Sequence, residues 1–256
     1  MNQALLVGIN NYPPPNRLNG CINDVNDVAA ELQNALGYSQ SNITKMLDAD
    51  ATAANIKAAL KAVVGKLGKG DKFLFWYSGH GAQLQDGNAA TDVICPVDFA
   101  FTAATSVTVS DFHDIFSTIP KGVTAAWGSD SCHSGDLEKD FYKLGVPKQF
   151  WRDEKDVRSK STSVKTFRDI SAALPSIALM SGCLSSQTSA DAYIDDRYNG
   201  AFTYYFLQTL KAPNGLAKPL VNLIPLVQAA LAKARYFQTP QLSGPPTLID
   251  KAFLSS

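Results

Sequence analysis

The sequence predicts an α/β fold with a mostly parallel central sheet and helices on both of its faces. Short apolar segments alternate with segments of helical periodicity along the chain, which is the order typical of parallel sheets. Hydrophobic residues make up 45% of the 256 residues and charged residues 18%. This is enough apolar material for a sizeable core, and it argues against disorder.

The first elements are indicated by apolar runs and by the turn residues that bound them. Residues 3–9 form an expected buried strand, followed by a loop rich in proline. Residues 25–36 carry apolar side chains at spacings of three and four, and Gly37 is a natural stop for that helix. A second helix is expected at 53–66, with Thr52 as its N-cap.

The later elements follow the same alternation. Further strands are expected at 72–78, 92–97, 122–128, 176–181 and 246–250. Further helices are expected at 111–118 with Ser110 as the cap, at 201–211 and at 220–235. Residues 136–170 are rich in Lys and Arg and poor in aliphatic side chains, so we expect a long exposed connection there.

Composition and charge exclude several classes of partner. Lys plus Arg and Asp plus Glu each number 23, so the chain has no overall basic field and no expected nucleic-acid partner. No apolar run approaches the ~18 residues that a membrane span needs. The first residues lack the basic start of a signal peptide, and four cysteines are too few for a disulfide scaffold. We therefore expect a cytoplasmic protein with no membrane partner.

Two short motifs carry the candidate chemistry. Residues 77–81 read YSGHG and residues 130–135 read DSCHSG, and each motif follows an expected buried strand. Both motifs should lie at the carboxyl edge of the sheet, where ligands and reacting groups gather. A thiolate is a strong nucleophile that a nearby imidazole can activate, which points to Cys132 and His80. His133 is a rival base, but adjacent residues point in different directions.

These motifs resemble the paired catalytic motifs of metacaspases and of their prokaryotic relatives, the orthocaspases. Supporting segments are ALLVGIN at 4–10, GCINDV at 20–25, ICPVDF at 94–99 and SGCLSSQTSADAYI at 181–194. His80 lies roughly 50 residues before Cys132, a spacing already known from animal caspases, whereas the animal caspase cysteine motif is absent. The resemblance covers about residues 3–210 and implies a caspase–haemoglobinase-like sandwich that hydrolyses peptide bonds after Arg or Lys.

The resemblance also assigns roles to single residues. It implies that Cys132 is the nucleophile and that His80 is the general acid and base. The backbone N–H groups of Gly81 and Cys132 are placed to stabilise the oxyanion of the tetrahedral intermediate. A metal hydrolase is not expected, because His80, Cys132 and His133 lack the spacing of a zinc site.

Substrate selection is expected to depend on acidic residues. Asp24 and Asp130 match the acidic residues that line the S1 pocket of the family, and Ser78 adds a polar contact there. Two carboxylates beside a cleft select a cationic P1 side chain and reject an acidic one. The later segment 191–196 is a weaker candidate for the rim of this pocket.

Calcium is the one cofactor that the resemblance raises. Many metacaspases need calcium, and this hard cation prefers several oxygen ligands that usually include carboxylates. The possible ligands are Asp92, Asp111, Asp136 and Asp140. The acidic pair expected near the start of the short helix is reduced here to Val109-Ser110-Asp111. We therefore expect no required cofactor and an activity that is independent of calcium.

A single caspase-like peptidase domain is expected to span residues 1–256. It would consist of a catalytic dyad region at 1–135, the basic connecting segment at 136–170 and a C-terminal subdomain-like part at 171–256. An enzyme that cuts after Arg or Lys should cut its own connection, within 139–168. The candidates are Lys139, Lys143, Lys148, Arg152, Lys155, Arg158, Lys160, Lys165 and Arg168.

Two other functions remain open at this point. One is a catalytically silent caspase-like scaffold for protein interaction, although such a relative commonly loses His80 or Cys132. The other is a cysteine hydrolase or transferase that acts on a non-peptide acyl group. The main expectation is a monomeric cysteine endopeptidase whose partners are peptides or proteins with a basic P1 residue.

Overall fold

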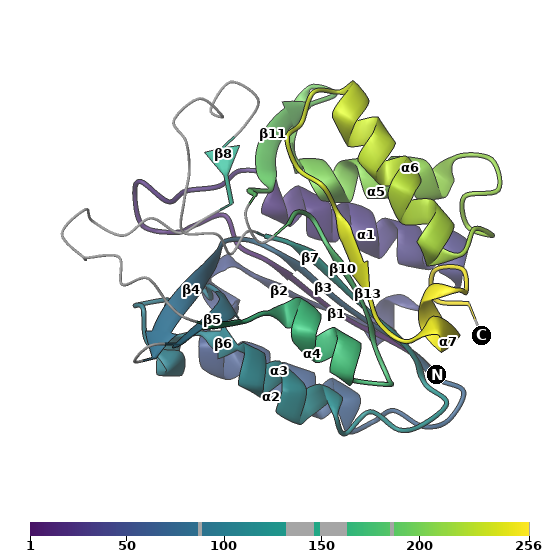
Figure 1. The fold of residues 1–256 in the computed structure, drawn as a ribbon, viewed down its shortest axis with the longest axis horizontal. Helices are drawn as coiled ribbons and strands as arrows, with labels where there is room; N and C mark the ends of the chain where they lie inside the picture. The colour runs from purple at the N-terminus through teal and green to yellow at the C-terminus, as the bar shows by residue number, and fades with distance from the viewer. Residues whose placement is uncertain (87–88, 132–145, 149–162, 185–186, 256) are drawn as a thin grey trace.

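A central β-sheet organises the computed structural model, which describes residues 1–86, 89–131, 146–148, 163–184 and 187–255 (Figure 1). In these residues the central sheet has six strands in the order β13-β10-β7-β3-β1-β2. The strands are β1 (Asn2–Gly8), β2 (Ile43–Leu47), β3 (Lys72–Ser78), β7 (Thr124–Asp130), β10 (Ala178–Ser181) and β13 (Gln241–Ser243). Neighbouring strands are parallel except for β13, which runs antiparallel to β10.

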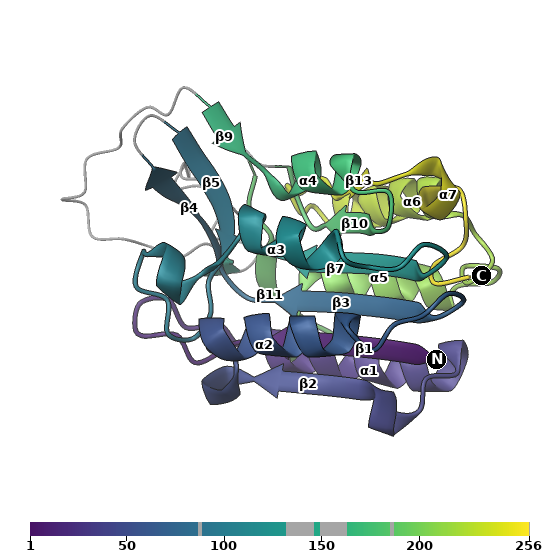
Figure 2. The same cartoon turned by 90° about the horizontal axis from the view of Figure 1, so that it is seen from below.

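Helices cover both faces of this sheet (Figures 1 and 2). One face carries α1 (Cys21–Leu36), α5 (Ala201–Lys211) and α6 (Leu220–Lys233). The other face carries α2 (Ala53–Val64), α3 (Val109–Phe116) and α4 (Phe167–Ala173). The last helix is the short α7 (Pro246–Ile249), and 3-10 turns occupy Gln40–Asn42, Asp48–Asp50 and Ala103–Thr105. The predicted α/β class with a mostly parallel sheet is therefore confirmed.

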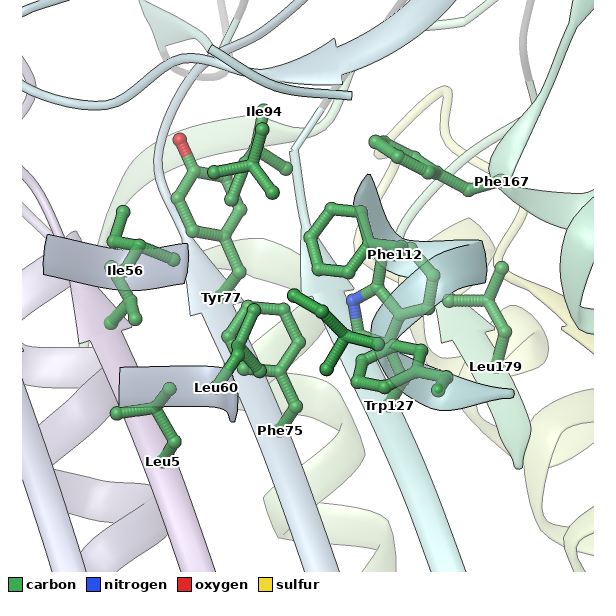
Figure 3. Close-up of a cluster of buried hydrophobic side chains, with 14 of the residues drawn as sticks. Leu5, Ile56, Leu60, Phe75, Tyr77, Ile94, Phe112, Trp127, Phe167 and Leu179 are labelled. Atoms are coloured by element: carbon green, nitrogen blue, oxygen red, sulfur yellow. The ribbon is translucent and has the colours of Figure 1, made fainter. Parts of the chain in front are cut away.

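Two hydrophobic clusters lie on the two faces of the sheet. Because side chains alternate along a strand, Phe75 packs with α2, α3 and α4, whereas its neighbour Trp76 packs with α1, α5 and α6. The first cluster centres on Phe75, Phe112 and Trp127, with Phe167 beside them (Figure 3). The strands read as nearly continuous apolar runs because both of their faces are buried.

Two smaller sheets adjoin the central one. The first contains β4 (Gly81–Asp86), β5 (Ala89–Ile94) and β6 (Val107–Thr108), with β9 (Ser163–Lys165) paired to β5. The second contains β12 (Arg197–Gly200), β11 (Ala190–Ile194) and β8 (Val146–Pro147). Since β4 begins three residues after β3 ends, the first small sheet extends from the carboxyl edge of the central sheet.

Local signals place several helix ends correctly. Gly37 has a φ of 71° and closes α1 with its N–H bonded to the carbonyl of Leu32, as the left-handed conformation of glycine allows. Thr52 caps α2 by accepting a hydrogen bond from the N–H of Asn55. The expected cap Ser110 is wrong, because Thr108 caps α3 and forms a capping box with Asp111.

Two of the expected strands are wrong. Residues 92–97 were expected in the parallel sheet, but β5 ends at Ile94 and pairs antiparallel with β4. Residues 246–250 were expected as the last strand, but that strand is β13, and Pro246 opens a helix instead. Proline fixes φ near the helical value and suits the first turn of a helix.

The basic segment 136–170 was expected to be an exposed connection, and where it is described it is exposed only in part, with Lys165 and Arg168 at the surface. Residues 146–147 form β8 against β11, and Lys148 is fully buried. Residues 163–165 pair with β5, and Thr166 caps α4 with a second capping box. No helix of the described chain has the length and apolarity that a membrane crossing would require.

Candidate active site

The carboxyl ends of β3 and β7 bring the two predicted motifs to the same edge of the sheet. Ser78 and Asp130 are register partners at the last position of the two strands. The N–H of Gly79 donates to the carbonyl of Asp130 at 3.4 Å. His80 follows directly. Cys132 lies two residues beyond Asp130 in the sequence, outside the described residues.

His80 is buried, and hydrogen bonds hold both its backbone and its ring. Its N–H donates to the hydroxyl of Tyr12 at 3.1 Å, and the Tyr12 and His80 rings lie 4.5 Å apart between centroids. The Nε2 atom lies 2.6 Å from the carbonyl oxygen of Asn16. A carbonyl can only accept a hydrogen bond, so Nε2 carries the ring proton. The nitrogen left to exchange a proton in a reaction is therefore Nδ1.

Burial lowers the pKa of His80 from 6.5 to about 4. Hydrogen bonds with the backbones of Asn16 and Lys148 act in the opposite direction, and the nearby charge of Lys148 adds slightly to the lowering. The imidazole is consequently neutral at pH 7. A neutral ring can take up a proton, as a general base must.

Asp24, Asp130 and Ser78 meet in one buried pocket, as the sequence predicts. Asp24 lies in the first turn of α1, and its Oδ2 accepts a hydrogen bond from the Ser78 hydroxyl at 2.5 Å. Its Oδ1 accepts a hydrogen bond from the N–H of Gly200 at 2.8 Å. Both carboxyl groups are buried, at 1% and 0% exposure.

Asp130 is held by side chains that the sequence analysis did not single out. Its Oδ1 accepts from the Ser189 hydroxyl at 2.5 Å. Its Oδ2 accepts from both the N–H and the hydroxyl of Thr203, at 2.9 and 2.7 Å. Gln238 in turn donates to the Ser189 hydroxyl at 3.1 Å. Ser189 lies in the segment 181–194 that supports the resemblance but was given no role there, and Thr203 and Gln238 lie outside every quoted motif.

Lys148 fills the acidic pocket. Its Nζ lies 2.7 Å from the Ser78 hydroxyl, 3.1 Å from Oδ2 of Asp24 and 3.3 Å from Oδ1 of Asp130. A buried ammonium is costly unless it is paired and hydrogen-bonded, and all three of these contacts compensate it. The pocket thus holds the side chain of a basic residue in this structure.

The charges in the pocket shift one another's proton affinity. Burial raises the pKa of Asp24 to about 6, the ammonium of Lys148 opposes that rise, and the like charge of Asp130 adds to it. Burial alone would lower the pKa of Lys148, but the carboxylates of Asp130 and Asp24 more than offset this and hold it well above its usual range. The lysine is therefore charged at neutral pH, and its charge favours the ionised form of Asp24.

Gly200 forms one wall of the pocket. A Cβ atom at this position would collide with carboxylate oxygens of Asp24 and Asp130 and with Nζ of Lys148. The backbone of Gly200 has an ordinary φ of −67°. Glycine is thus required here for space, so that the polypeptide can approach the two carboxylates closely.

The predicted oxyanion donor Gly81 also contacts Lys148. The N–H of Gly81 donates to the carbonyl oxygen of Lys148 at 3.2 Å, and the N–H of Lys148 donates to the carbonyl of Ser189 at 2.9 Å. The side chain, the N–H and the carbonyl of Lys148 are therefore all bound by the site. The carbonyl oxygen bound by Gly81 belongs to the residue whose backbone also contacts the imidazole of His80.

Comparison with known proteins identifies the family. The sequence model described as the caspase domain matches residues 1–249. The chain belongs to the caspase domain family. It is 30% identical to a Metacaspase-1 of Meyerozyma guilliermondii, over 94% of this chain and 68% of the relative. It is 27% identical to Metacaspase-9 of Arabidopsis thaliana, over 98% of this chain and 96% of the relative.

Solved structures support the same caspase-like fold. A protein of Geobacter sulfurreducens superposes with a TM-score of 0.74 at 23% identity, covering 100% of this chain and 99% of that one. Caspase-1 of Spodoptera frugiperda superposes with a TM-score of 0.61 at 12% identity, covering 95% and 86%. With the metacaspase relatives, family membership makes this chain a caspase-like cysteine endopeptidase that acts on peptides or proteins.

The described calcium candidates of this caspase-domain chain are engaged by protein groups. Asp92 is buried and accepts from Nε2 of Gln83 at 3.0 Å. Asp111 completes the capping box at the start of α3 and pairs with Lys57 at 3.0 Å. The described residues contain no group of three or more His, Cys, Asp or Glu that could hold a metal ion. The other two candidates, Asp136 and Asp140, lie outside the described residues.

The rim segment 191–196 contributes one buried acid. Asp191 is fully buried, and its carboxylate accepts hydrogen bonds from the N–H groups of Asn19 and Gly20, at 2.7 and 2.8 Å. Burial raises its pKa, and the charge of Lys148 opposes that rise. Asp191 therefore fastens the loop before α1, the helix that carries Asp24.

Proposed function

We propose that this caspase-domain enzyme cleaves peptide bonds on the carboxyl side of Lys or Arg. The observation that carries this proposal is the buried pair of carboxylates, Asp24 and Asp130, which holds an ammonium group at the sheet edge beside His80. An acidic P1 side chain would meet two like charges in a space closed to water and would be rejected. The planar guanidinium of Arg suits two carboxylates, because it can bind carboxylates bidentately.

Cys132 and His80 form the proposed catalytic dyad. The thiolate of Cys132 attacks the carbonyl carbon of the scissile bond, and the thiol proton passes to the neutral imidazole of His80. His80 then donates this proton to the leaving amine as the C–N bond breaks. Water attacks the resulting thioester with His80 as the base, which releases the carboxylate product and restores the thiol.

Gly81 is the proposed donor to the oxyanion. Its N–H already donates to a peptide carbonyl in the site, at 3.2 Å. The backbone N–H of Cys132 is the second proposed donor. Loss of one such donor costs about 2.7–4 kcal/mol of transition-state stabilisation in a serine protease, so the pair would make a large contribution to the rate.

Self-processing in the basic segment and independence from calcium complete the proposal. Self-processing is supported by the chain's own Lys148, whose ammonium pairs with the two proposed S1 carboxylates, Asp24 and Asp130. Calcium independence is supported by the protein partners of Asp92 and Asp111, because carboxylates engaged in capping and pairing are poor candidates for a shared cation site.

A panel of fluorogenic peptides that differ only in Arg, Lys or Asp at P1 tests the proposal. We expect hydrolysis after Arg and Lys, none after Asp, and equal rates in calcium and in chelator. Cys132→Ala and His80→Ala should abolish hydrolysis. Cleavage after Asp alone would defeat the S1 assignment, and loss of activity in chelator would defeat calcium independence. No hydrolysis of any peptide would favour the silent scaffold.

A further inference from the structure

Strand β11 extends beyond the two residues that pair with β8. Residues 146–147 pair antiparallel with residues 190–191 (Figure 1), and the N–H of Lys148 donates to the carbonyl of Ser189 at 2.9 Å. Every second residue of a strand directs its N–H and C=O groups to the same side. The main chain of Tyr193 therefore faces the same edge of β11 as that of Ser189. A longer extended chain can continue this ladder as far as Tyr193.

The register assigns each position of a bound peptide to a residue of β11. A basic P1 residue whose side chain reaches the acidic pocket lies opposite Ser189, as Lys148 does. In an antiparallel pair, P3 then lies opposite Asp191 and P5 lies opposite Tyr193. Directly opposed residues place their side chains on one face, with Cβ atoms about 4.5–5.5 Å apart. The P5 side chain of a substrate would consequently lie against the ring of Tyr193.

Tyr193 and Tyr198 form an exposed aromatic pair on this face of the small sheet. They are register partners of β11 and β12, and their rings meet edge to face with centroids 5.2 Å apart. Tyr193 is 62% exposed and Tyr198 is 41% exposed. Because the strand order is β12-β11-β8, Tyr198 lies on one side of Tyr193, and the edge that pairs with β8 lies on the other. An apolar side chain placed at that edge would cover the Tyr193 ring.

We propose that Tyr193, supported by Tyr198, is an S5 subsite that selects an apolar or aromatic P5 side chain. This inference rests on the proposed peptidase function and adds a second determinant of its substrate class. In an extended chain the P5 and P1 residues are about 13 Å apart, at about 3.3 Å per residue. The subsite therefore acts on substrate binding and does not touch the reacting atoms. It would distinguish among the many Lys and Arg residues of a target protein by the sequence that precedes them.

A peptide series that differs only at P5 tests the subsite. The substrates are acetyl-Gly-X-Ala-Val-Pro-Lys-aminomethylcoumarin, with Phe, Leu, Gly or Lys as X. We expect kcat/KM with Phe or Leu to be about three- to fivefold higher than with Gly, as for a cross-strand aromatic or aliphatic pair. The difference should lie in KM, with kcat unchanged, because the contact is equal in ground and transition states. Equal values for Phe, Leu and Gly, or a preference for Lys, would overturn the proposal.

Variants of the tyrosine assign the preference to this ring. Tyr193→Ser should make kcat/KM the same for Phe, Leu and Gly, whereas Tyr193→Phe should keep the preference. The matched control is Leu226→Ser on α6, at an apolar side chain that is 45% exposed, and it should also keep the preference. The shorter substrate acetyl-Val-Pro-Lys-aminomethylcoumarin does not reach Tyr193, so all four proteins should cleave it equally. A P5 preference that persists in Tyr193→Ser would overturn the assignment.

N-methylation of the peptide tests the register with the wild-type protein alone. The N–H groups of P1, P3 and P5 face β11, whereas those of P2, P4 and P6 face away from it. N-methylation at P5 of the Leu peptide should lower kcat/KM at least about threefold, because it removes a donor and adds bulk at the paired edge. N-methylation at P6 should leave kcat/KM unchanged. Equal effects at P5 and P6 would overturn the pairing with Tyr193.

Failure of this inference and failure of the proposed function look different. A wild-type chain that cleaves every peptide of the series after Lys at the same rate overturns the S5 subsite and leaves the peptidase assignment standing. A chain that hydrolyses neither the long nor the short peptides overturns both.

Discussion

Asp24 and Asp130 place two carboxylates against the single ammonium of Lys148, in a space almost closed to water. Removing one partner from a buried ionic group typically costs about 3–5 kcal/mol, because the remaining charge is left uncompensated. The hydroxyls of Ser78, Ser189 and Thr203 satisfy the remaining lone pairs. Two buried carboxylates without a cation between them would be unfavourable, so the pocket selects a cationic side chain.

Substituting Asp130→Asn keeps the shape of the side chain and removes its charge. We expect kcat/KM for a Lys peptide to fall at least about 30-fold, since loss of a buried charge partner costs about 2 kcal/mol or more. Self-cutting should slow in parallel. The matched control is Asp114→Asn, whose carboxylate is 82% exposed. If kcat/KM is unchanged in Asp130→Asn, this carboxylate does not bind the substrate.

His80 should make the protein less stable in acid. Its pKa is about 4 in the folded chain and near 6.5 when unfolded, so between these values only the unfolded chain takes up the proton. The free energy of unfolding therefore falls as pH drops through this window, by up to about 3 kcal/mol from this residue.

This effect is measured by denaturant unfolding of Cys132→Ala with and without His80→Gln, across pH 7 to 4. Glutamine can still donate to the Asn16 carbonyl but does not titrate, so the fall should be smaller in His80→Gln. The raised pKa of Asp24 has the opposite effect, because it makes the folded chain more stable as pH falls. This contribution is present in both proteins and does not affect the comparison. If the free energy of unfolding falls equally with pH in the two proteins, the buried imidazole of His80 is not kept neutral.

Single residues of the site were predictable only where a local motif carries them. Asp24, Ser78, His80 and Asp130 lie in the short segments that resemble metacaspase motifs, and the structure brings these four to one edge. Gly200 and Thr203 have no such signal, because their role depends on the return of β12 and α5 to the end of β7. Ser189 lies in the quoted segment 181–194, but the segment alone does not show that it contacts Asp130. Lys148 was one of nine basic candidates, and of the three that the structure describes it alone is buried, whereas Lys165 and Arg168 are exposed.

Among the elements, α3 offers a direct test of helix capping. Its true cap Thr108 accepts the N–H of Asp111 at 3.1 Å, and Asp111 accepts the N–H of Thr108 at 2.8 Å. Thr108→Ala should lower the free energy of unfolding by about 1 kcal/mol. Ser110→Ala, two residues later on the exposed face of the helix, should change it by less than about 0.5 kcal/mol. Equal losses for the two variants would contradict this assignment.

The junction between β12 and α5 offers a second test, at Gly200. Because an added Cβ would collide with Asp24, Asp130 and Lys148, Gly200→Ala should abolish cleavage after Lys and lower stability by about 1–3 kcal/mol. Gly68→Ala is the matched control, since its Cβ would lie 3.8 Å from an Asp71 oxygen in ordinary contact. Activity that survives Gly200→Ala would show that the backbone at position 200 can shift to make room for a Cβ atom.

The helices were easier to predict than the strands at the edge of the fold. Amphipathic periodicity and caps are local, and the expected helix at 201–211 matches α5 at both ends. The sheet that a strand joins cannot be predicted from local sequence, because an apolar run does not show which other strands it will pair with. That is why 92–97 was assigned to the parallel sheet, and why a short strand such as β8, whose partner β11 lies more than 40 residues away, was not foreseen.

For the whole molecule, the two hydrophobic clusters extend across the proposed cut. Trp127 of β7 is the register partner of Leu179 of β10, and Trp76 of β3 stacks on Phe202 of α5 with centroids 5.8 Å apart. Neither fragment can bury these surfaces alone, so the two fragments that a cut in the basic segment would produce should stay associated. They should co-elute in native gel filtration and separate in denaturant. Separate native elution would contradict a shared core.

The pairing of β8 with β11 shows that the edge of β11 beside Asp130 and Ser189 accepts an extended chain, and the same edge is open in principle to a substrate of the proposed peptidase. A chain that binds in the same way must hydrogen-bond its backbone N–H and C=O groups to the enzyme. The same groups cannot then be hydrogen-bonded within a helix of the substrate. A lysine inside a stably coiled region would resist until that region unwound. The rate at which a target protein is cleaved would then depend on how easily the region around the lysine unfolds, and less on how many Lys and Arg residues it has. Unstructured linkers would be cleaved first.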